Sequence, residues 1–110
     1  MSKKTYRTLD QVEEEVIRDN PEEIDAYIQE VFANYADHKN ASALLASLRV
    51  VAKVKGMSNI ANEISMTREG LYKALSSKGN PRFDNINAIM SALGYQLVPK
   101  KVDATNEIQP

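Results

Sequence analysis

The 110-residue chain contains no cysteine, no tryptophan and only one histidine. The lack of cysteine excludes a disulfide framework, a thiol nucleophile and a thiolate metal site. One imidazole without any thiolate makes a zinc-type metal centre implausible. We therefore expect the protein to bind no metal and no other cofactor. A chain without cysteine is also compatible with a cytoplasmic location, which we expect.

Long hydrophobic runs are missing as well. No apolar run approaches the roughly 20 residues that a membrane-spanning helix needs. The first ten residues, MSKKTYRTLD, include basic residues but no apolar stretch after them, so they do not resemble a secretory signal. We find no internal repeat and no low-complexity tract, and we expect no membrane partner.

The composition suits one compact domain. A hydrophobic content of 43% over 110 residues is sufficient to build a core. We expect an acidic N-terminal segment at 1–19, a helical domain at 20–98 and a mobile tail at 99–110, because the tail has little to bury.

Charge is distributed unevenly, although the formal net charge is only −1. Residues 1–39 carry five Lys/Arg against ten Asp/Glu, a net charge of −5. Residues 49–82 carry seven Lys/Arg against two Asp/Glu, a net charge of +5. A local basic surface can supply phosphate contacts in nucleic-acid binding. By itself, however, the basic segment is equally compatible with ordinary solvated charge.

No catalytic constellation is visible in the sequence. The single histidine, His38, follows Asp37 near the end of an acidic segment, where a surface pair explains it better than a general base. The acidic run at 13–15 is best explained as a solvated face. Gly79 beside Lys78 is one glycine, which does not form a phosphate-binding loop. We therefore expect no enzymatic activity.

Apolar residues recur at helical spacing along most of the chain, which predicts an all-α bundle of five or six helices. Thr8 and Gln11 form a capping-box pattern ahead of a first helix. Asn20 before Pro21 predicts the start of a second helix, with Asn20 as its N-cap. The apolar stripe of this second helix comprises Ile24, Tyr27, Ile28, Val31, Phe32 and Tyr35.

Two further helices are expected on either side of the central segment. Asn40 is expected to cap one helix, which ends at Gly56, and Asp84 to cap the other, which ends at Gly94. Residues 95–98 could add a short C-terminal strand. The expected apolar faces are Leu44, Leu45, Leu48, Val51 and Ala52 in the first helix, and Ile86, Ile89, Met90 and Leu93 in the second.

The stripe at 24–35 and the segment at 95–98 are more apolar than one small bundle needs. Two interpretations remain open for them. Both segments either pack in the core or form a partner surface, because exposed apolar stripes tend to mark interfaces. A homodimer interface is one such surface.

Residues 58–75 have the pattern of two short helices joined by a tight turn. Ser58 is expected to cap the first helix, Ser65 and Met66 to form the turn, and Thr67 to cap the second helix. This pattern is typical of a helix-turn-helix, whose second helix enters the DNA major groove. The residues expected to face inward are Ile60, Ala61, Ile64, Leu71 and Leu75.

The second of these two helices is expected to present polar side chains outward. Arginine suits guanine, lysine suits guanine or phosphate, and glutamate suits cytosine N4. Thr67 and the first backbone N–H groups could hold a phosphate. The pattern is only moderately specific, because any small helical protein contains adjacent amphipathic helices with polar outer faces. The outward positions are Arg68, Glu69, Tyr72, Lys73 and Ser76.

The chain resembles one known family. Residues 55–97, KGMSNIANEISMTREGLYKALSSKGNPRFDNINAIMSALGYQL, closely resemble the probable addiction-module antidote proteins. These are HigA-like antitoxins with a helix-turn-helix of the Cro and phage-repressor type. The most specific part is GLYKALSSKGNPRF at 70–83. Residues 20–28 also resemble the family's upstream helix, so the likeness covers about residues 20–98.

This resemblance implies an antitoxin that binds and blocks a small basic toxin of the RelE/ParE type. It also implies that the protein binds operator DNA as a homodimer and represses its own operon. Ser65 stands where the family usually has glycine, so a left-handed turn residue here is expected to cost about 1 kcal/mol. The resemblance implies that Asn59, Thr67, Arg68, Glu69, Tyr72 and Lys73 contact DNA. We add Ser76 from the outward face of the second short helix and Lys78 from the basic segment.

Other functions remain open from the sequence. The protein could be a stand-alone transcriptional regulator. It could also be a pure protein-interaction module, in which the two short helices are only a scaffold and a toxin docks on the acidic N-terminal half. A net charge of −5 in that half would complement a basic partner.

Overall fold

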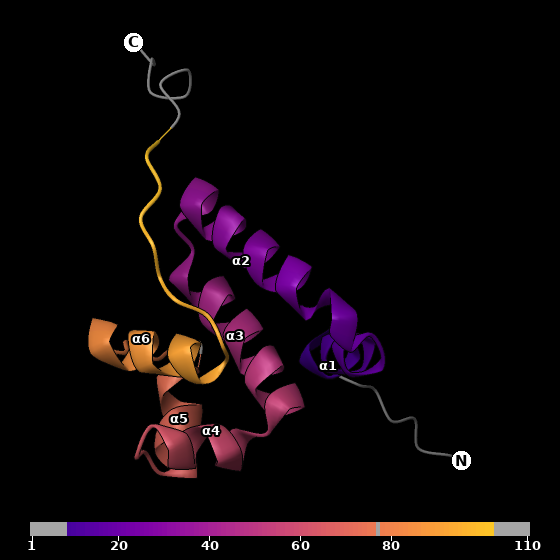
Figure 1. Ribbon diagram of the computed structural model, residues 1–110, viewed down its shortest axis with the longest axis vertical. Coiled ribbons are helices and arrows are strands. Elements are labelled where there is room, and N and C mark those ends of the chain that lie inside the picture. Colours follow the sequence, from indigo (N-terminus) through magenta and orange to yellow (C-terminus); the bar gives the residue numbers. More distant parts are fainter. Residues whose placement is uncertain (1–8, 77, 103–110) are drawn as a thin grey trace.

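The computed structural model describes residues 9–76 and 78–102, which form six α-helices and no strand (Figure 1). The predicted all-α bundle of five or six helices is therefore confirmed. None of the described helices is long and apolar enough to cross a membrane. In chain order the elements are α1 (Leu9–Asp19), the 3-10 helix η1 (Pro21–Glu23), α2 (Ile24–His38), α3 (Ala41–Lys55), α4 (Met57–Glu63), α5 (Arg68–Ala74) and α6 (Phe83–Ala92).

Helix α3 occupies the centre of the fold. It lies between α1 and α2 on one side and α4, α5 and α6 on the other (Figure 1). The predicted apolar face of α3 is confirmed, with Leu44 only half-buried at its edge. Val50 is fully buried as well, although it was not predicted. A helix covered on two sides buries more than one stripe, and Val50 fills the second side.

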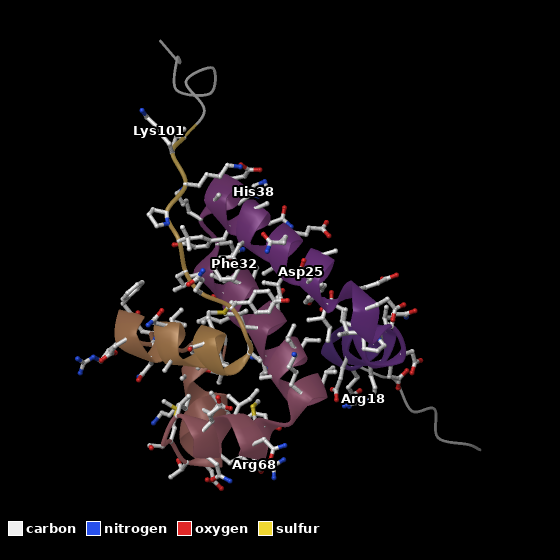
Figure 2. All side chains as sticks on the ribbon, viewed as in Figure 1. Arg18, Asp25, Phe32, His38, Arg68 and Lys101 are labelled. Atoms are coloured by element: carbon white, nitrogen blue, oxygen red, sulfur yellow. The ribbon has the colours of Figure 1, made fainter. Side chains whose placement is uncertain are left out.

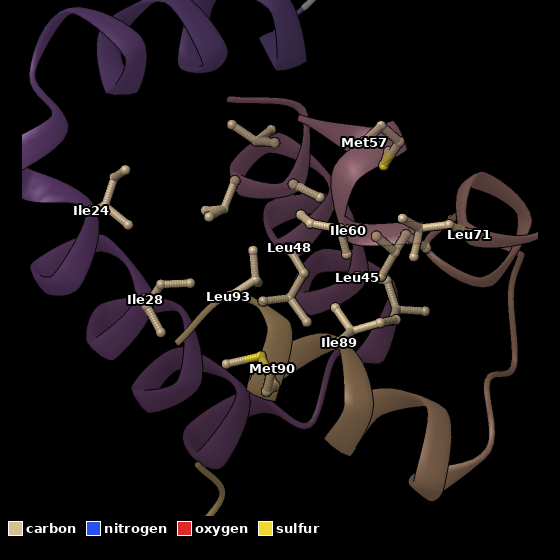
Figure 3. Packing of buried hydrophobic residues seen from close by; sticks show 14 of the residues in the cluster. Ile24, Ile28, Leu45, Leu48, Met57, Ile60, Leu71, Ile89, Met90 and Leu93 are labelled. Carbon is tan, nitrogen blue, oxygen red and sulfur yellow. The ribbon is translucent and has the colours of Figure 1, made fainter. Parts of the chain in front are cut away.

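One continuous hydrophobic core joins the helices (Figure 3). The apolar stripe of α2 contributes Ile24 and Ile28, and α1 contributes Ile17 from the acidic N-terminal segment. Tyr27 and Phe32 are half-buried against the same core, so most of the stripe of α2 packs inward within one chain. The largest fully buried side chains of the core are Leu48, Leu71, Leu75, Ile89, Met90, Val50 and Val51.

Helix starts were predicted with mixed success. Asn40 caps α3 as expected, because its side-chain oxygen accepts a hydrogen bond from the Ala43 N–H at 3.1 Å. Asn20 does not cap the following helix by its side chain. Its Nδ2 instead donates to the Val16 carbonyl at 2.7 Å, which closes α1. The predicted capping box at Thr8 lies outside the described residues.

Two other predicted caps are wrong. Ser58 cannot cap α4, because α4 already begins at Met57 and follows directly on Gly56, the residue that ends α3. Asp84 lies inside the first turn of α6, where the capping position belongs to Arg82. The Asp84 carboxylate lies 3.5 Å from the Arg82 guanidinium instead. In both cases the helix begins two residues earlier than the sequence suggested.

The C-terminal segment at 95–98 is extended but is not a strand, so that prediction is also wrong. The described residues contain no strand with which it could pair. Gly94 ends α6 with a positive φ of 97°, and the chain then turns so that Tyr95 and Leu97 pack against the core. Burial raises the pKa of Tyr95, and the charge of Asp25 on α2 and a hydrogen bond with its side chain raise it further.

Candidate nucleic-acid interface

Helices α4 and α5 are joined by a turn with defined geometry. Ser65 has a φ of 59°, in the left-handed region. Its N–H donates to the Asn62 carbonyl at 3.2 Å, and the Met66 N–H donates to the Ala61 carbonyl at 2.8 Å. This pair of bonds is a Schellman motif, in which glycine usually occupies the left-handed position. The predicted turn at Ser65 and Met66 is confirmed.

Replacing Ser65 with glycine is expected to stabilise the protein by about 0.5–1 kcal/mol, because glycine adopts positive φ without a Cβ clash. The urea midpoint of the helical circular dichroism signal measures this change. Ser47→Gly is the matched control, since Ser47 lies inside α3 and the same change there should destabilise by about 1 kcal/mol. A Ser65→Gly midpoint at or below that of the wild type would contradict the prediction.

The turn leads directly into α5, and the apolar side of α5 faces the core. The Thr67 hydroxyl oxygen accepts the Gly70 N–H at 2.9 Å, so the predicted cap of α5 is confirmed. Gly70 leaves room for this cap, because a Cβ there would lie 2.9 Å from the same oxygen. Leu71 and Leu75 are both 0% exposed. The opposite side of α5 is therefore held at the surface.

The outward residues of α5 differ in their exposure. Arg68, Glu69 and Lys73 are exposed, whereas Tyr72 is half-buried. The Arg68 guanidinium lies 5.6 Å from the centroid of the Tyr72 ring, and the Lys53 ammonium of α3 lies 6.0 Å from it. Both are within the range of a cation–π contact. Figure 2 shows Arg68 at the end of the molecule formed by α4 and α5, far from Lys101.

Three adjoining hollows lie around α5, and most of the predicted DNA-binding residues line one of them. Asn59, Arg68 and Tyr72 line the first hollow, together with Lys53. Thr67 lines the second hollow, again with Arg68. The third hollow lies toward the end of α5. Glu69 lines none of the three hollows. The predicted residues that line this third hollow are Lys73, Ser76 and Lys78.

The end of α5 is fixed by residues whose roles the sequence did not reveal. Arg49 of α3 donates to the Leu75 carbonyl at 2.7 Å, so its charge supports the fold. Gly79 donates to the Ser76 carbonyl at 2.8 Å. A Cβ on Gly79 would lie 2.6 Å from the Ala74 carbonyl oxygen, so only glycine fits against α5 without a shift. In the sequence, Gly79 was considered only for a phosphate-binding loop, and this packing role was not predicted.

Sequence reasoning also missed Lys53 and Glu14 in the first hollow. Lys53 belonged to the basic segment, but its place beside Tyr72 depends on how α3 packs against α5. Glu14 comes from α1, where it accepts a hydrogen bond from Arg18 at 2.7 Å. No pattern in the sequence links residue 14 to residues 53–72, because only the packing of α1 brings it there.

Comparison with known proteins gives two matches. The model of a family described as probable addiction module antidote protein matches residues 8–101, a range that includes α1. The chain is also 40% identical over 75 residues to an uncharacterized protein of Haemophilus influenzae. That alignment covers 68% of this chain and 73% of the relative. No solved structure matches the chain.

Proposed function

Because the chain belongs to the family of probable addiction module antidote proteins, we propose that it is the DNA-binding antitoxin of a type II toxin–antitoxin module. The antitoxin role and the toxin partner follow from the family. The proposal adds that the toxin is small, basic and of the RelE/ParE type. It adds also that the antitoxin binds its own operator as a homodimer in the cytoplasm and represses the operon.

The observation that carries the DNA-binding proposal is the anchoring of α5. Leu71 and Leu75 are fully buried, and they hold the exposed Arg68 and Lys73 at the surface of the same helix. An exposed, rigidly anchored helix with such side chains suits the recognition helix of a helix-turn-helix. In this role Arg68 would contact guanine, Lys73 guanine or phosphate, and Glu69 cytosine.

The surroundings of α5 support a contact with the phosphate backbone. Lys78, which lines the third hollow beside α5, is exposed, as are Arg68 and Lys73. These cations belong to the basic segment at 49–82, whose net charge is +5. Phosphate contacts by lysine and arginine position a protein on duplex DNA and make its affinity depend on salt. A homodimer would place two such surfaces on the half-sites of a two-fold operator.

A second candidate is a pure protein-interaction module. It is favoured by the acidic N-terminal half, residues 1–39, with its net charge of −5. In that case α4 and α5 would be only a scaffold. For neither candidate do we propose enzymatic activity. His38, the single histidine, is exposed in the last turn of α2, and its Nδ1 lies 3.1 Å from the Asn34 carbonyl of the same helix.

One experiment separates the two candidates. The purified protein is titrated against its own promoter fragment and a scrambled fragment, by fluorescence anisotropy at several salt concentrations. A specific operator binder should prefer the promoter by about 10³-fold or more and weaken as salt rises. Weak and equal binding to both fragments would reject the repressor role. Growth rescue of cells expressing the protein from the adjacent reading frame tests the antitoxin role separately.

A further inference from the structure

A groove between α1 and α2 leaves apolar side chains exposed, as far as the described residues show. Val12 and Val16 of α1 are 40% and 50% exposed, and they are among the few large hydrophobic residues exposed in the described part of the chain. Both line one groove, whose opposite wall includes Ala26 of α2. Val12 and Val16 are one helical turn apart, so they present a continuous apolar strip.

The rim of this groove is negatively charged. Glu13, Glu23 and Glu30 all line it. Glu13 accepts a hydrogen bond from the Tyr27 hydroxyl at 3.4 Å. Among the described residues, Glu23 and Glu30 form no ion pair, so their charges face solvent without compensation. The groove therefore combines an apolar floor with an acidic rim.

This combination restricts what can occupy the groove. The acidic rim would repel the phosphates of DNA. A second copy of the chain, bound groove to groove by a two-fold axis, would set Glu23 and Glu30 near their own copies and repel as well. An apolar floor with an acidic rim fits a basic segment that has apolar residues one helical turn apart.

We propose that the α1–α2 groove is the docking surface for a basic amphipathic helix of the toxin. The assignment rests on the proposed antitoxin function, and it adds which surface holds the toxin and by what chemistry. Apolar side chains of the toxin helix cover Val12 and Val16, while its flanking lysines or arginines face Glu23 and Glu30. Docking by this groove leaves the exposed side chains of α5 free to contact DNA.

The test uses the purified protein encoded by the reading frame adjacent to this gene as the probe. Its affinity for the full chain is measured by isothermal titration calorimetry. Val16→Glu and Glu30→Lys are each expected to weaken binding of the adjacent protein by about tenfold or more. Val16→Glu places a charge in the apolar floor, and Glu30→Lys reverses the sign of one charge on the acidic rim. The matched controls are Val98→Glu, at a valine that is 67% exposed, and Asp37→Lys, on the same helix as Glu30. They are expected to change the affinity by less than about twofold.

Each outcome decides a different point. If the wild-type chain does not bind the adjacent protein, the proposed antitoxin function fails. If the wild type binds and Val16→Glu binds as tightly, the groove assignment is overturned while the antitoxin function stands. If Val16→Glu converts a dimer into a monomer by light scattering, the groove joins two copies and the assignment is also overturned. The helical circular dichroism signal of each variant checks that it is folded, and Val12→Glu replaces Val16→Glu if the latter does not fold.

Discussion

The double substitution Arg68→Ala/Lys73→Ala is expected to weaken binding to the chain's own promoter by about thirtyfold or more. Each lost base or phosphate contact costs about 1–3 kcal/mol, and about 1.4 kcal/mol corresponds to a tenfold change in affinity. Both side chains are exposed on a helix whose other side is buried, so the change should not disturb the core. The stacking of Arg68 on Tyr72 reduces the side-chain freedom lost on binding, which makes Arg68 the more important of the two.

The control for this prediction must remove the same charge elsewhere. Lys100→Ala/Lys101→Ala does so on the C-terminal segment, and Lys101 lies far from Arg68 (Figure 2). A mobility shift with the promoter fragment, done at one fixed salt concentration, compares the two double variants. The lysine control is expected to remain within about threefold of the wild type, because it loses only long-range attraction. Equal shifts by the wild type and the Arg68/Lys73 variant would show that α5 is not the reading helix.

Leu71→Ala is expected to destabilise the protein by about 2–5 kcal/mol, because Leu71 is fully buried where α5 meets the core and its loss leaves a cavity. A domain of this size is typically stable by only about 5–15 kcal/mol, so this one change removes a large share. Urea denaturation followed by circular dichroism should show a midpoint lowered by about 1 M or more.

Leu97→Ala provides the matched comparison for Leu71→Ala. Leu97 packs against the same core but is only half-buried, on the extended C-terminal segment. Its truncation should cost less than about 2 kcal/mol, because a partly exposed site leaves little enclosed cavity. A Leu71→Ala protein as stable as the Leu97→Ala protein would show that α5 is not anchored through Leu71. The positioning of Arg68 would then lack its structural basis.

Helix content and core faces could be predicted from the sequence, because helical periodicity is a local property. The spacing of Leu71 and Leu75 predicted which side of α5 is buried, and the structure confirms it. Caps proved harder, since a side chain such as Asn20 can bond either forward or backward along the chain. Asn20 bonds backward to Val16, and only the geometry between α1 and η1 decides this.

The composition of the candidate interface was predictable only in part. Arg68, Lys73 and Thr67 follow from helical spacing and capping, both of which are local. Lys53 and Glu14 join the first hollow only because α1 packs against α3 and α3 packs against α4. The groove between α1 and α2 likewise depends on how two helices lie against each other, which no spacing within one helix encodes.

The sequence alone therefore determined the helices, most of the residues that face the core and the resemblance to an antidote family, because periodicity and short motifs act over a few residues. Tertiary structure decided which distant side chains meet. It placed Arg49 at the end of α5, buried the second side of α3 at Val50, and left Val12 and Val16 partly exposed beside acidic residues. These outcomes depend on the packing of whole helices, whose relative positions result from many weak contacts made at the same time.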